Sequence, residues 1–488
     1  MIRASTPLFQ GARLRLAKLA KLTLAIPALG IPSLGIPSLV IPFMAGIFFF
    51  LLAPSPRAQY ELPEQSPDQF IRSLAAAIDE TSLTPRERLG LRLFFDSNLS
   101  EPAGTACASC HDPRRAFTGN NSTMIGVAQG SRSDQFGTRD APTVMYLATA
   151  PRFGSIEKDG KRVPAGGLFW DGRADTLEEQ AKQPFFSPVE MNNADTPALI
   201  AKVAKAAYVG EFRKLWGDKI FDNPEAALDA VAASIAAFER TRVFQPFTAK
   251  FDYVMRGQAQ FTEEEQRGLS LFTIRQKGNC AECHTVDAAS RDPQKSLFTD
   301  FSYRALGLPR SMRIPKNIDP AFIDLGLCER VPVTGAKLPV TAIKQQVTDP
   351  AACGLFKTPT LRNITITAPY MHNGFFDHLR DAVAFYATRD TDPARWFSEG
   401  RKFNDLPAQY HANVDVDTPP YQRRPQQRPQ LTNEEIDDIV AFLYTLTDGY
   451  KTAPSRSGNR PPAEMTPPRP PVSSPSPPTS SPASPRDY

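Results

Sequence analysis

Apolar residues recur every three or four positions in several stretches, which is the spacing of one buried helix face. Helices are predicted over residues 66–95, 228–238, 378–387 and 431–446, and a shorter one around residues 177–181 that Pro184 is expected to end. Residues 118–139, 151–168, 286–356 and 391–430 show no such spacing and are predicted as loops. The pattern predicts a mainly α-helical protein with long irregular loops.

The two ends of the chain differ in composition from its middle. Residues 1–58 carry six Lys or Arg and no Asp or Glu, around an apolar run from about Leu22 to Ala53. This pattern is typical of an export signal, and a retained membrane anchor is the alternative. Residues 451–488 hold twelve Pro among many Ser and are predicted to be disordered.

The net charge of +4 comes from the N-terminal segment. Removing its six basic residues leaves 50 Lys and Arg against 52 Asp and Glu, a net charge of −2. Nucleic-acid-binding proteins carry a basic patch or stripe, so nothing in this composition indicates nucleic acid as a partner.

Two short stretches follow one pattern, C-x-x-C-H, the attachment signature of a c-type haem. The two thiols reach the vinyl groups of one porphyrin, and the adjoining His reaches the iron. One zinc ion held by four thiolates is the main alternative, but the stretches begin 173 residues apart and each carries its own His. The sequence predicts two covalently bound haems, at Cys107, Cys110 and His111 and at Cys280, Cys283 and His284.

The surroundings of the two haem motifs repeat as well. Each motif is preceded by a helix start with capping-box spacing and by a Gly-Leu-x-Leu-Phe stretch, and each is followed by a Phe-Thr pair. These features are Thr84–Glu87, Gly90–Phe94 and Phe117-Thr118 in the first copy, and Thr262–Glu265, Gly268–Phe272 and Phe298-Thr299 in the second. We therefore expect two cytochrome c-like domains packed face to face, over residues 59–250 and 251–450.

The number of His and Met residues that could bind the irons indicates whether the protein is an electron carrier or an enzyme. An electron carrier saturates both irons, whereas an enzyme keeps one coordination position open. The chain has five His, and residues 112–283 contain none. The Met residues of that stretch are Met124, Met145, Met191 and Met255. The first haem is therefore expected to be five-coordinate, with an open face.

The two remaining cysteines, Cys328 and Cys353, lie 25 residues apart. In an oxidising compartment they are expected to pair; otherwise they are two unrelated small apolar residues. An export segment and c-type haems both indicate the bacterial periplasm.

A specific resemblance rests on Phe169–Arg173, Gln180, Pro188–Met191 and Lys357–Gly374. In order and spacing these stretches resemble the bacterial dihaem cytochrome c peroxidase and MauG family, over most of residues 66–450. The resemblance implies that the first haem reacts with peroxide and the second stores an electron.

The resemblance also implies the roles of three residues. Glu190 would move a proton between the two peroxide oxygens, Gln180 would position the peroxide, and Trp170 would carry electrons between the haems. Without the resemblance, Glu190 is better interpreted as a surface carboxylate and Trp170 as a core residue. A calcium ion between the haems is implied too, held by Asp140, where the family often has Asn, and by the carbonyls of Thr367 and Pro369.

Two positions depart from typical peroxidases of the family, and a third departs from MauG. Arg132 stands where these carry a His that blocks the first haem, so no reductive activation is expected. Tyr386 replaces the usual Met ligand of the second iron, as in MauG, and Met371 is the alternative ligand. Gly278 stands where MauG has the surface Trp that oxidises its protein substrate, so that route is not implied here.

The leading interpretation is a periplasmic dihaem enzyme that reduces hydrogen peroxide with electrons from a small donor protein, a cytochrome c or a cupredoxin. One alternative is a MauG-like oxidase that modifies a partner protein through a state with both irons ferryl. The other is a non-enzymatic dihaem electron-transfer cytochrome.

Overall fold

The structure is a computed structural model that describes residues 80–119, 121, 123, 125–329 and 349–451. The predicted export segment, residues 66–79 of the first predicted helix, Met124 and the Pro-rich tail lie outside these residues. Within them, no helix combines the length and the apolarity that a membrane crossing requires.

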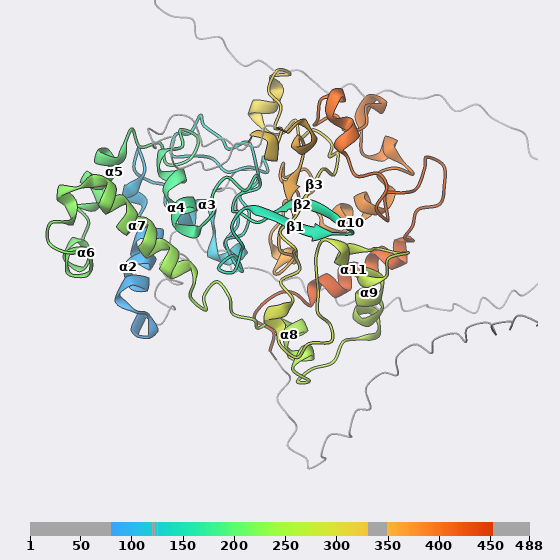
Figure 1. Cartoon of the computed structure of the whole chain (residues 1–488), viewed down its shortest axis with the longest axis horizontal. Helices are drawn as coiled ribbons and strands as arrows, with labels where there is room; N and C mark the ends of the chain where they lie inside the picture. Colours follow the sequence, from blue (N-terminus) through green and yellow to red (C-terminus); the bar gives the residue numbers. More distant parts are fainter. Residues whose placement is uncertain (1–79, 120, 122, 124, 330–348, 452–488) are drawn as a thin grey trace, which may run out of the picture. The chain divides into compact units, whose positions relative to one another are not determined.

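The described residues are mainly helical with few strands (Figure 1), which confirms the predicted class. The α-helices are α2 (Pro85–Phe94), α3 (Cys107–Cys110), α4 (Leu177–Phe186), α5 (Thr196–Val203), α6 (Val209–Trp216), α7 (Pro224–Glu239), α8 (Lys250–Met255), α9 (Glu263–Thr273), α10 (Leu379–Thr388) and α11 (Asn433–Tyr444). Two antiparallel pairs are formed by β1 (Gly154–Lys158) with β2 (Lys161–Ala165) and by β3 (Tyr303–Arg304) with β4 (Phe356–Lys357). Short 3-10 turns occur along the connecting segments.

The repeat seen in the sequence corresponds to two helix pairs that pack in the same way. Helix α2 packs on α7, and α9 packs on α11. A Cβ atom on Gly90 would lie 1.9 Å from the carbonyl oxygen of Ser234, and one on Gly268 would lie 2.0 Å from that of Asp438. Glycine is therefore required in both copies, because each pair brings a helix against the backbone of its partner.

Each helix pair contributes to its own apolar core. The first core includes Phe94, Phe117 and Phe238, and the second includes Phe298 and Phe442. The capping boxes predicted at Thr84 and Thr262 form, and a third at Thr432 begins α11. Two separate cores agree with two haem-binding units, whereas the boundaries at residues 59, 251 and 450 and the face-to-face packing remain predictions.

Pro184 does not end its helix, so that prediction was wrong. Helix α4 continues to Phe186, with Pro184 inside its last turn. A proline at this place removes a single helical hydrogen bond, the one to the carbonyl of Gln180. Phe185 and Phe186 are both buried in the first core, and this burial holds the last turn in place.

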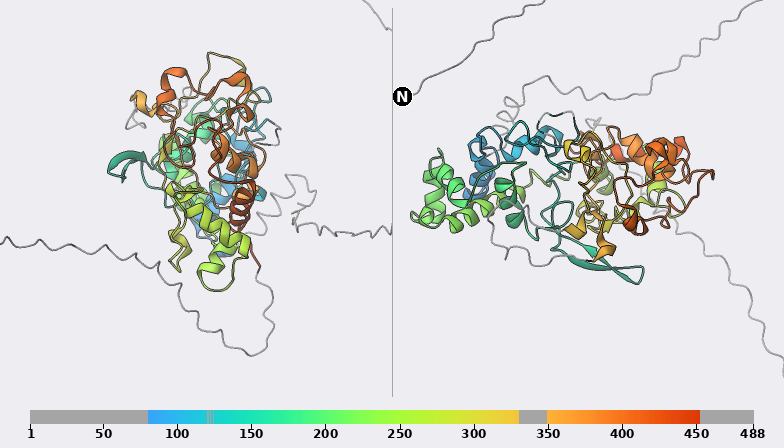
Figure 2. Two further views of the ribbon diagram at one scale, coloured as in Figure 1. Left: turned by 90° about the vertical axis from the view of Figure 1, so that its right-hand side faces the viewer. Right: turned by 90° about the horizontal axis from the view of Figure 1, so that it is seen from above.

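The segment predicted as a loop over residues 151–168 instead contains the β1–β2 hairpin. This hairpin projects from the segments around it (Figure 2). Its register runs from Gly154 opposite Ala165 to Lys158 opposite Lys161. Asp159 and Gly160 form the turn with φ of 49° and 71°. Asp-Gly is a strong sequence signal for such a two-residue turn, but the flanking strands are largely polar and show little alternation.

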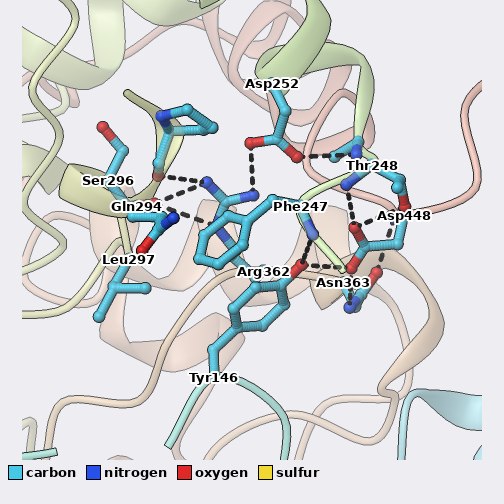
Figure 3. A network of polar contacts seen from close by, with 12 residues as sticks. Tyr146, Phe247, Thr248, Asp252, Gln294, Ser296, Leu297, Arg362, Asn363 and Asp448 are labelled. Atoms are coloured by element: carbon cyan, nitrogen blue, oxygen red, sulfur yellow. Dashed lines mark hydrogen bonds and ion pairs between the residues drawn. The ribbon is translucent and has the colours of Figure 1, made fainter. Parts of the chain in front are cut away.

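A buried polar network joins loops that are distant in the sequence (Figure 3). The Arg362 guanidinium forms an ion pair with Asp252 at 2.8 Å. Asp448 accepts hydrogen bonds from the Tyr146 hydroxyl at 2.6 Å and from the Asn363 amide at 2.8 Å. The network therefore ties residues that follow the first haem motif to those that surround the second.

Candidate haem and peroxide site

The first haem motif forms a single helical turn, α3. The backbone N–H of His111 donates to the carbonyl of Cys107 at 2.9 Å, so that the His follows directly on the turn. Its Nδ1 lies 3.0 Å from the Phe117 carbonyl, which accepts when Nδ1 carries the proton. Burial lowers the pKa of His111, which favours the neutral ring. A neutral imidazole with its Nδ1 engaged presents Nε2 to a metal.

The second motif forms a 3-10 turn over Cys280–Glu282, and its His makes the same contacts. The N–H of His284 donates to the Cys280 carbonyl at 2.8 Å, and its Nδ1 lies 3.0 Å from the Phe298 carbonyl. Both Phe residues have left-handed backbone conformations, with φ of 56° at Phe117 and 55° at Phe298. The repeated Phe-Thr pair therefore orients the His ring in each unit, a role that the sequence alone did not reveal.

The four thiols do not converge on one metal ion. Cys107 packs against the first core and Cys280 against the second. No cluster of three or more His, Cys, Asp or Glu suited to a metal ion occurs within residues 80–329 and 349–451 as described. Attachment of two separate porphyrins fits this arrangement better than a zinc site.

Glu190 lies beside the first motif. It belongs to a turn that follows α4, in which its N–H donates to the Ser187 carbonyl at 3.0 Å. After burial, the charge of Glu190 is the next cause of the raised pKa of Cys110, which places the carboxylate close to that thiol. Its side chain is partly exposed and forms no hydrogen bond to the described residues. Gln180 lies on α4 and is also partly exposed.

The loop that would carry a blocking His contacts the backbone of the segment that contains Glu190. Its Ser131 N–H donates to the Glu190 carbonyl at 2.7 Å. A Cβ on Gly130 would lie 2.5 Å from the Val189 carbonyl oxygen, so glycine permits this close approach. The Arg132 side chain is exposed and donates to the Pro188 carbonyl at 3.3 Å.

Trp170 connects the two halves of the described chain. It is 9% exposed, and its indole N–H donates to the carbonyl of Asp140 at 2.8 Å. The rings of Trp170 and His372 form an edge-to-face pair with 6.3 Å between the centroids, and His372 stacks on Phe356 at 3.4 Å. The carbonyl of Trp170 accepts from the N–H of Lys357 at 2.8 Å. Trp170 also lines the cavity of the second haem motif.

Several buried charged residues lie near Trp170, and the sequence alone did not indicate them. Arg139 pairs with Asp171 at 2.7 Å and with Asp324 at 2.6 Å. Although burial acts in the opposite direction, Arg139 holds the pKa of Asp324 at about 2. Burial lowers the pKa of Lys357 to about 7, and its ammonium donates to the Gly167 carbonyl at 2.7 Å. Arg139, Asp171 and Lys357 adjoin or belong to motif stretches, but nothing in their spacing indicated that they meet.

The β1–β2 hairpin contacts the second haem motif. Lys158 pairs with Asp300 at 2.7 Å, and its ammonium also donates to the carbonyl of Glu282. The same ammonium lies 3.9 Å from Sγ of Cys283. A segment of the first half of the sequence thus reaches the attachment turn of the second haem.

Asp140 fits a cation site. It is 6% exposed, and one carboxylate oxygen, Oδ1, has no hydrogen-bond partner among the described residues. Burial raises the pKa of Asp140 well above its usual value, and the charge of Arg115 opposes this rise. Arg115 also donates to the carbonyl of Ala368, between Thr367 and Pro369. An unpaired buried carboxylate near a loop that presents carbonyls suits a hard cation such as calcium.

The cavity of the second motif contains both candidate ligands of the second iron. Tyr386 and Met371 line it together with Cys280, Cys283 and His284. Tyr386 projects from α10, and Met371 lies in the preceding loop with φ of 72°. The choice between them stays a prediction. Cys328 and Cys353, whose pairing the sequence left open, form a disulfide bond.

Comparison with known proteins agrees with this geometry. A family model described as di-haem cytochrome c peroxidase matches residues 84–260. The chain is 36% identical to the methylamine utilization protein MauG of Paracoccus denitrificans, over 74% of this chain and 88% of that protein. It is 29% identical to cytochrome c551 peroxidase of Nitrosomonas europaea, over 74% and 79%.

A solved structure of a diheme peroxidase is also similar to this chain. The diheme peroxidase BthA from Burkholderia thailandensis is 40% identical, with a TM-score of 0.69 over 79% of this chain and 93% of that one. Because these matches extend along most of both sequences, the chain belongs to the di-haem cytochrome c peroxidase family, whose members are oxidoreductases that act on peroxide and carry two haems.

Proposed function

We propose that the chain reduces hydrogen peroxide at the first haem motif, with electrons that a donor protein delivers through the second. The observation that carries this proposal is the position of Glu190 beside Cys110, under a loop whose Arg132 points to solvent. This arrangement leaves a carboxylate accessible next to the first haem without a His that must first move away. No reductive activation is therefore needed.

Haem attached at Cys107 and Cys110 would supply the iron that binds peroxide and accepts its oxidising equivalents. Glu190 takes the proton from the bound oxygen and returns it to the distant oxygen, which leaves as water. The amide of Gln180 holds the peroxide by hydrogen bonding. Two electrons and two further protons complete the conversion of hydrogen peroxide to two water molecules.

Trp170 carries electrons between the halves, a role supported by its contacts with Asp140 and with His372. At the second motif, His284 and Tyr386 would bind the iron, with Met371 as the alternative to Tyr386. A phenolate oxygen is a hard anionic donor, so it lowers the reduction potential of the second haem. Asp140, with the carbonyls of Thr367 and Pro369, would hold calcium, which the unpaired oxygen of Asp140 supports.

The periplasm of a bacterium is the proposed location. The disulfide between Cys328 and Cys353 supports an oxidising compartment. The electron donor there would be a small cytochrome c or a cupredoxin. Anchoring to the membrane would depend on residues 1–58, which lie outside the described residues.

The test is replacement of Glu190 by Gln, which keeps the shape and removes the proton carrier. Peroxide-dependent oxidation of a reduced cytochrome c should fall by about 10²–10⁴-fold. Glu211→Gln is the matched control, because this carboxylate lies on α6 and is 45% exposed in a pair with Arg92. An unchanged rate in Glu190→Gln would show that another group moves the proton.

A MauG-like oxidase that modifies a partner protein is the second candidate. The 36% identity to MauG and the phenol of Tyr386 in the second cavity favour it. Such an oxidase should retain both oxidising equivalents of peroxide for a long time and oxidise common reduced cytochromes slowly. Stopped-flow spectra after peroxide addition separate the two candidates. Membership in a family of peroxide-using oxidoreductases sets aside the non-enzymatic electron carrier.

A further inference from the structure

The cavity of the second motif contains a buried polar group that the chemistry above does not use. Tyr421 is 5% exposed, and its hydroxyl forms no hydrogen bond within the described part of the chain. Its ring stacks on that of Tyr386, with the centroids 5.7 Å apart and the planes inclined by 28°. Both rings line the cavity together with His284. Buried hydroxyls are normally paired, so an unpaired one beside a candidate ligand indicates a partner that forms in the assembled site.

We propose that Tyr421 is a positioning residue whose hydroxyl donates a hydrogen bond to the phenolate oxygen of Tyr386 when Tyr386 binds the second haem iron. This inference rests on the proposed ligation by His284 and Tyr386. A phenolate oxygen bound to one metal keeps a lone pair that can accept a hydrogen bond.

The surroundings of Tyr421 hold its ring in place. The guanidinium of Arg389 lies 3.9 Å from the centre of the Tyr421 ring, and the Arg389 side chain is fully buried. Arg389 is itself fixed by Asp390 at 2.5 Å and by the carbonyls of Leu306 at 2.8 Å and Asp415 at 2.6 Å. The Tyr421 ring thus contacts a rigid buried cation as well as Tyr386. A cation over the ring also draws electron density from it and makes the hydroxyl a better donor.

Such a hydrogen bond would tune the second haem. Donation to the phenolate removes electron density from the ligand, so the ligand stabilises the oxidised iron less. The reduction potential of the second haem therefore lies higher than with an unassisted phenolate, and the donor protein can reduce it more readily. The same hydrogen bond moves the phenolate-to-iron charge-transfer band to higher energy.

Tyr421→Phe tests the inference in the holoprotein, because it keeps the stacked ring and the cation contact and removes only the hydroxyl. We expect a lower reduction potential of the second haem and a charge-transfer band at longer wavelength. Tyr444→Phe is the control, since Tyr444 is 61% exposed and does not line the cavity. In the wild-type protein, the phenolate C–O vibration in resonance Raman spectra should shift in deuterated water. Tyr421→Phe should abolish that shift.

Two outcomes would overturn the inference, and they can be told apart. If Tyr386→Phe leaves the second-haem spectrum unaltered, the ligation by Tyr386 is wrong and the hydrogen bond falls with it. If Tyr386→Phe changes the spectrum but the wild-type vibration does not respond to deuterated water, the ligation stands and the hydrogen bond alone is wrong. The second measurement needs no variant, so it decides the question even where Tyr421→Phe fails to fold.

Discussion

Replacing Arg362 by Met should destabilise the protein by about 3–5 kcal/mol, the range observed when one partner of a buried ion pair is removed. The Arg362 side chain is fully buried. Its polar contacts are drawn in Figure 3. Its guanidinium donates to the carboxylate of Asp252 at 2.8 Å, to the carbonyl of Ser296 at 3.0 and 2.9 Å, and to the carbonyl of Pro293 at 3.0 Å. All of these bonds are lost in the variant.

The magnitude follows from what remains after the substitution. Methionine keeps an unbranched apolar stem against the rings of Phe247 and Phe251, which lie 4.8 and 5.8 Å from the guanidinium carbon. The loss is therefore mainly electrostatic. Among the described residues, Asp252, whose side chain is also fully buried, keeps the hydrogen bond from the N–H of Ala249. The expected loss is a large part of the 5–15 kcal/mol that stabilises a typical domain.

The destabilisation should depend on pH. Burial raises the pKa of Asp252 above its usual 3.8, and Arg362 opposes that rise, so removing Arg362 raises the pKa further. A carboxyl with a raised pKa in the folded state loses stability as pH increases from its unfolded value to its folded value. The loss in Arg362→Met should therefore be largest at neutral pH and should shrink as the pH is lowered towards 4.

Denaturation of the holoprotein by guanidinium chloride, followed by far-UV circular dichroism at pH 7.5 and pH 5, measures this effect. Arg267→Met is the control, because the Arg267 side chain is 55% exposed and pairs with Asp438 at 2.8 Å. The denaturation midpoint of this variant should hardly change. The reasoning is refuted if both variants shift the midpoint equally, or if the shift in Arg362→Met does not depend on pH.

Three further predictions concern packing, covalent links and calcium. Gly268→Ala should lower the free energy of unfolding by about 1–3 kcal/mol or more, because its Cβ would meet a backbone carbonyl at 2.0 Å. Gly210→Ala on α6, where no atom lies within 4 Å of the added Cβ, should raise it by about 0.5–1 kcal/mol. Thermal unfolding compares the two variants, and equal effects would contradict the close helix packing. Cys328→Ser opens a disulfide that spans 25 residues and should lower stability by about 3 kcal/mol in calorimetry; no change would mean that the bond does not constrain the unfolded chain. Asp140→Ala should weaken calcium binding at least tenfold in titration calorimetry of chelator-treated holoprotein, and an unchanged affinity would place calcium elsewhere.

The sequence by itself determined the features that depend on neighbours within a few residues. Each C-x-x-C-H motif needs one helical turn, and the capping boxes need only the spacing from Thr84 to Glu87 and its counterparts. The helix faces follow from a period of 3.6 residues, so α7, α10 and α11 lie where the pattern predicted them. The repeat around both motifs identified two haem-binding units because the local packing is the same in each.

Tertiary structure decided what depends on contacts between distant segments. Arg115 donates a hydrogen bond to the carbonyl of Ala368, which lies 253 residues later in the sequence. The indole N–H of Trp170 donates to the backbone carbonyl of Asp140 rather than to a side chain. No local pattern encodes these pairs, since their partners meet only when loops from both halves pack together. Tyr421 lies in a stretch predicted as a loop, and only the folded chain brings its unpaired hydroxyl next to Tyr386. Local spacing therefore predicted which residues bind haem, whereas the packing of loops decided which groups lie around each haem motif.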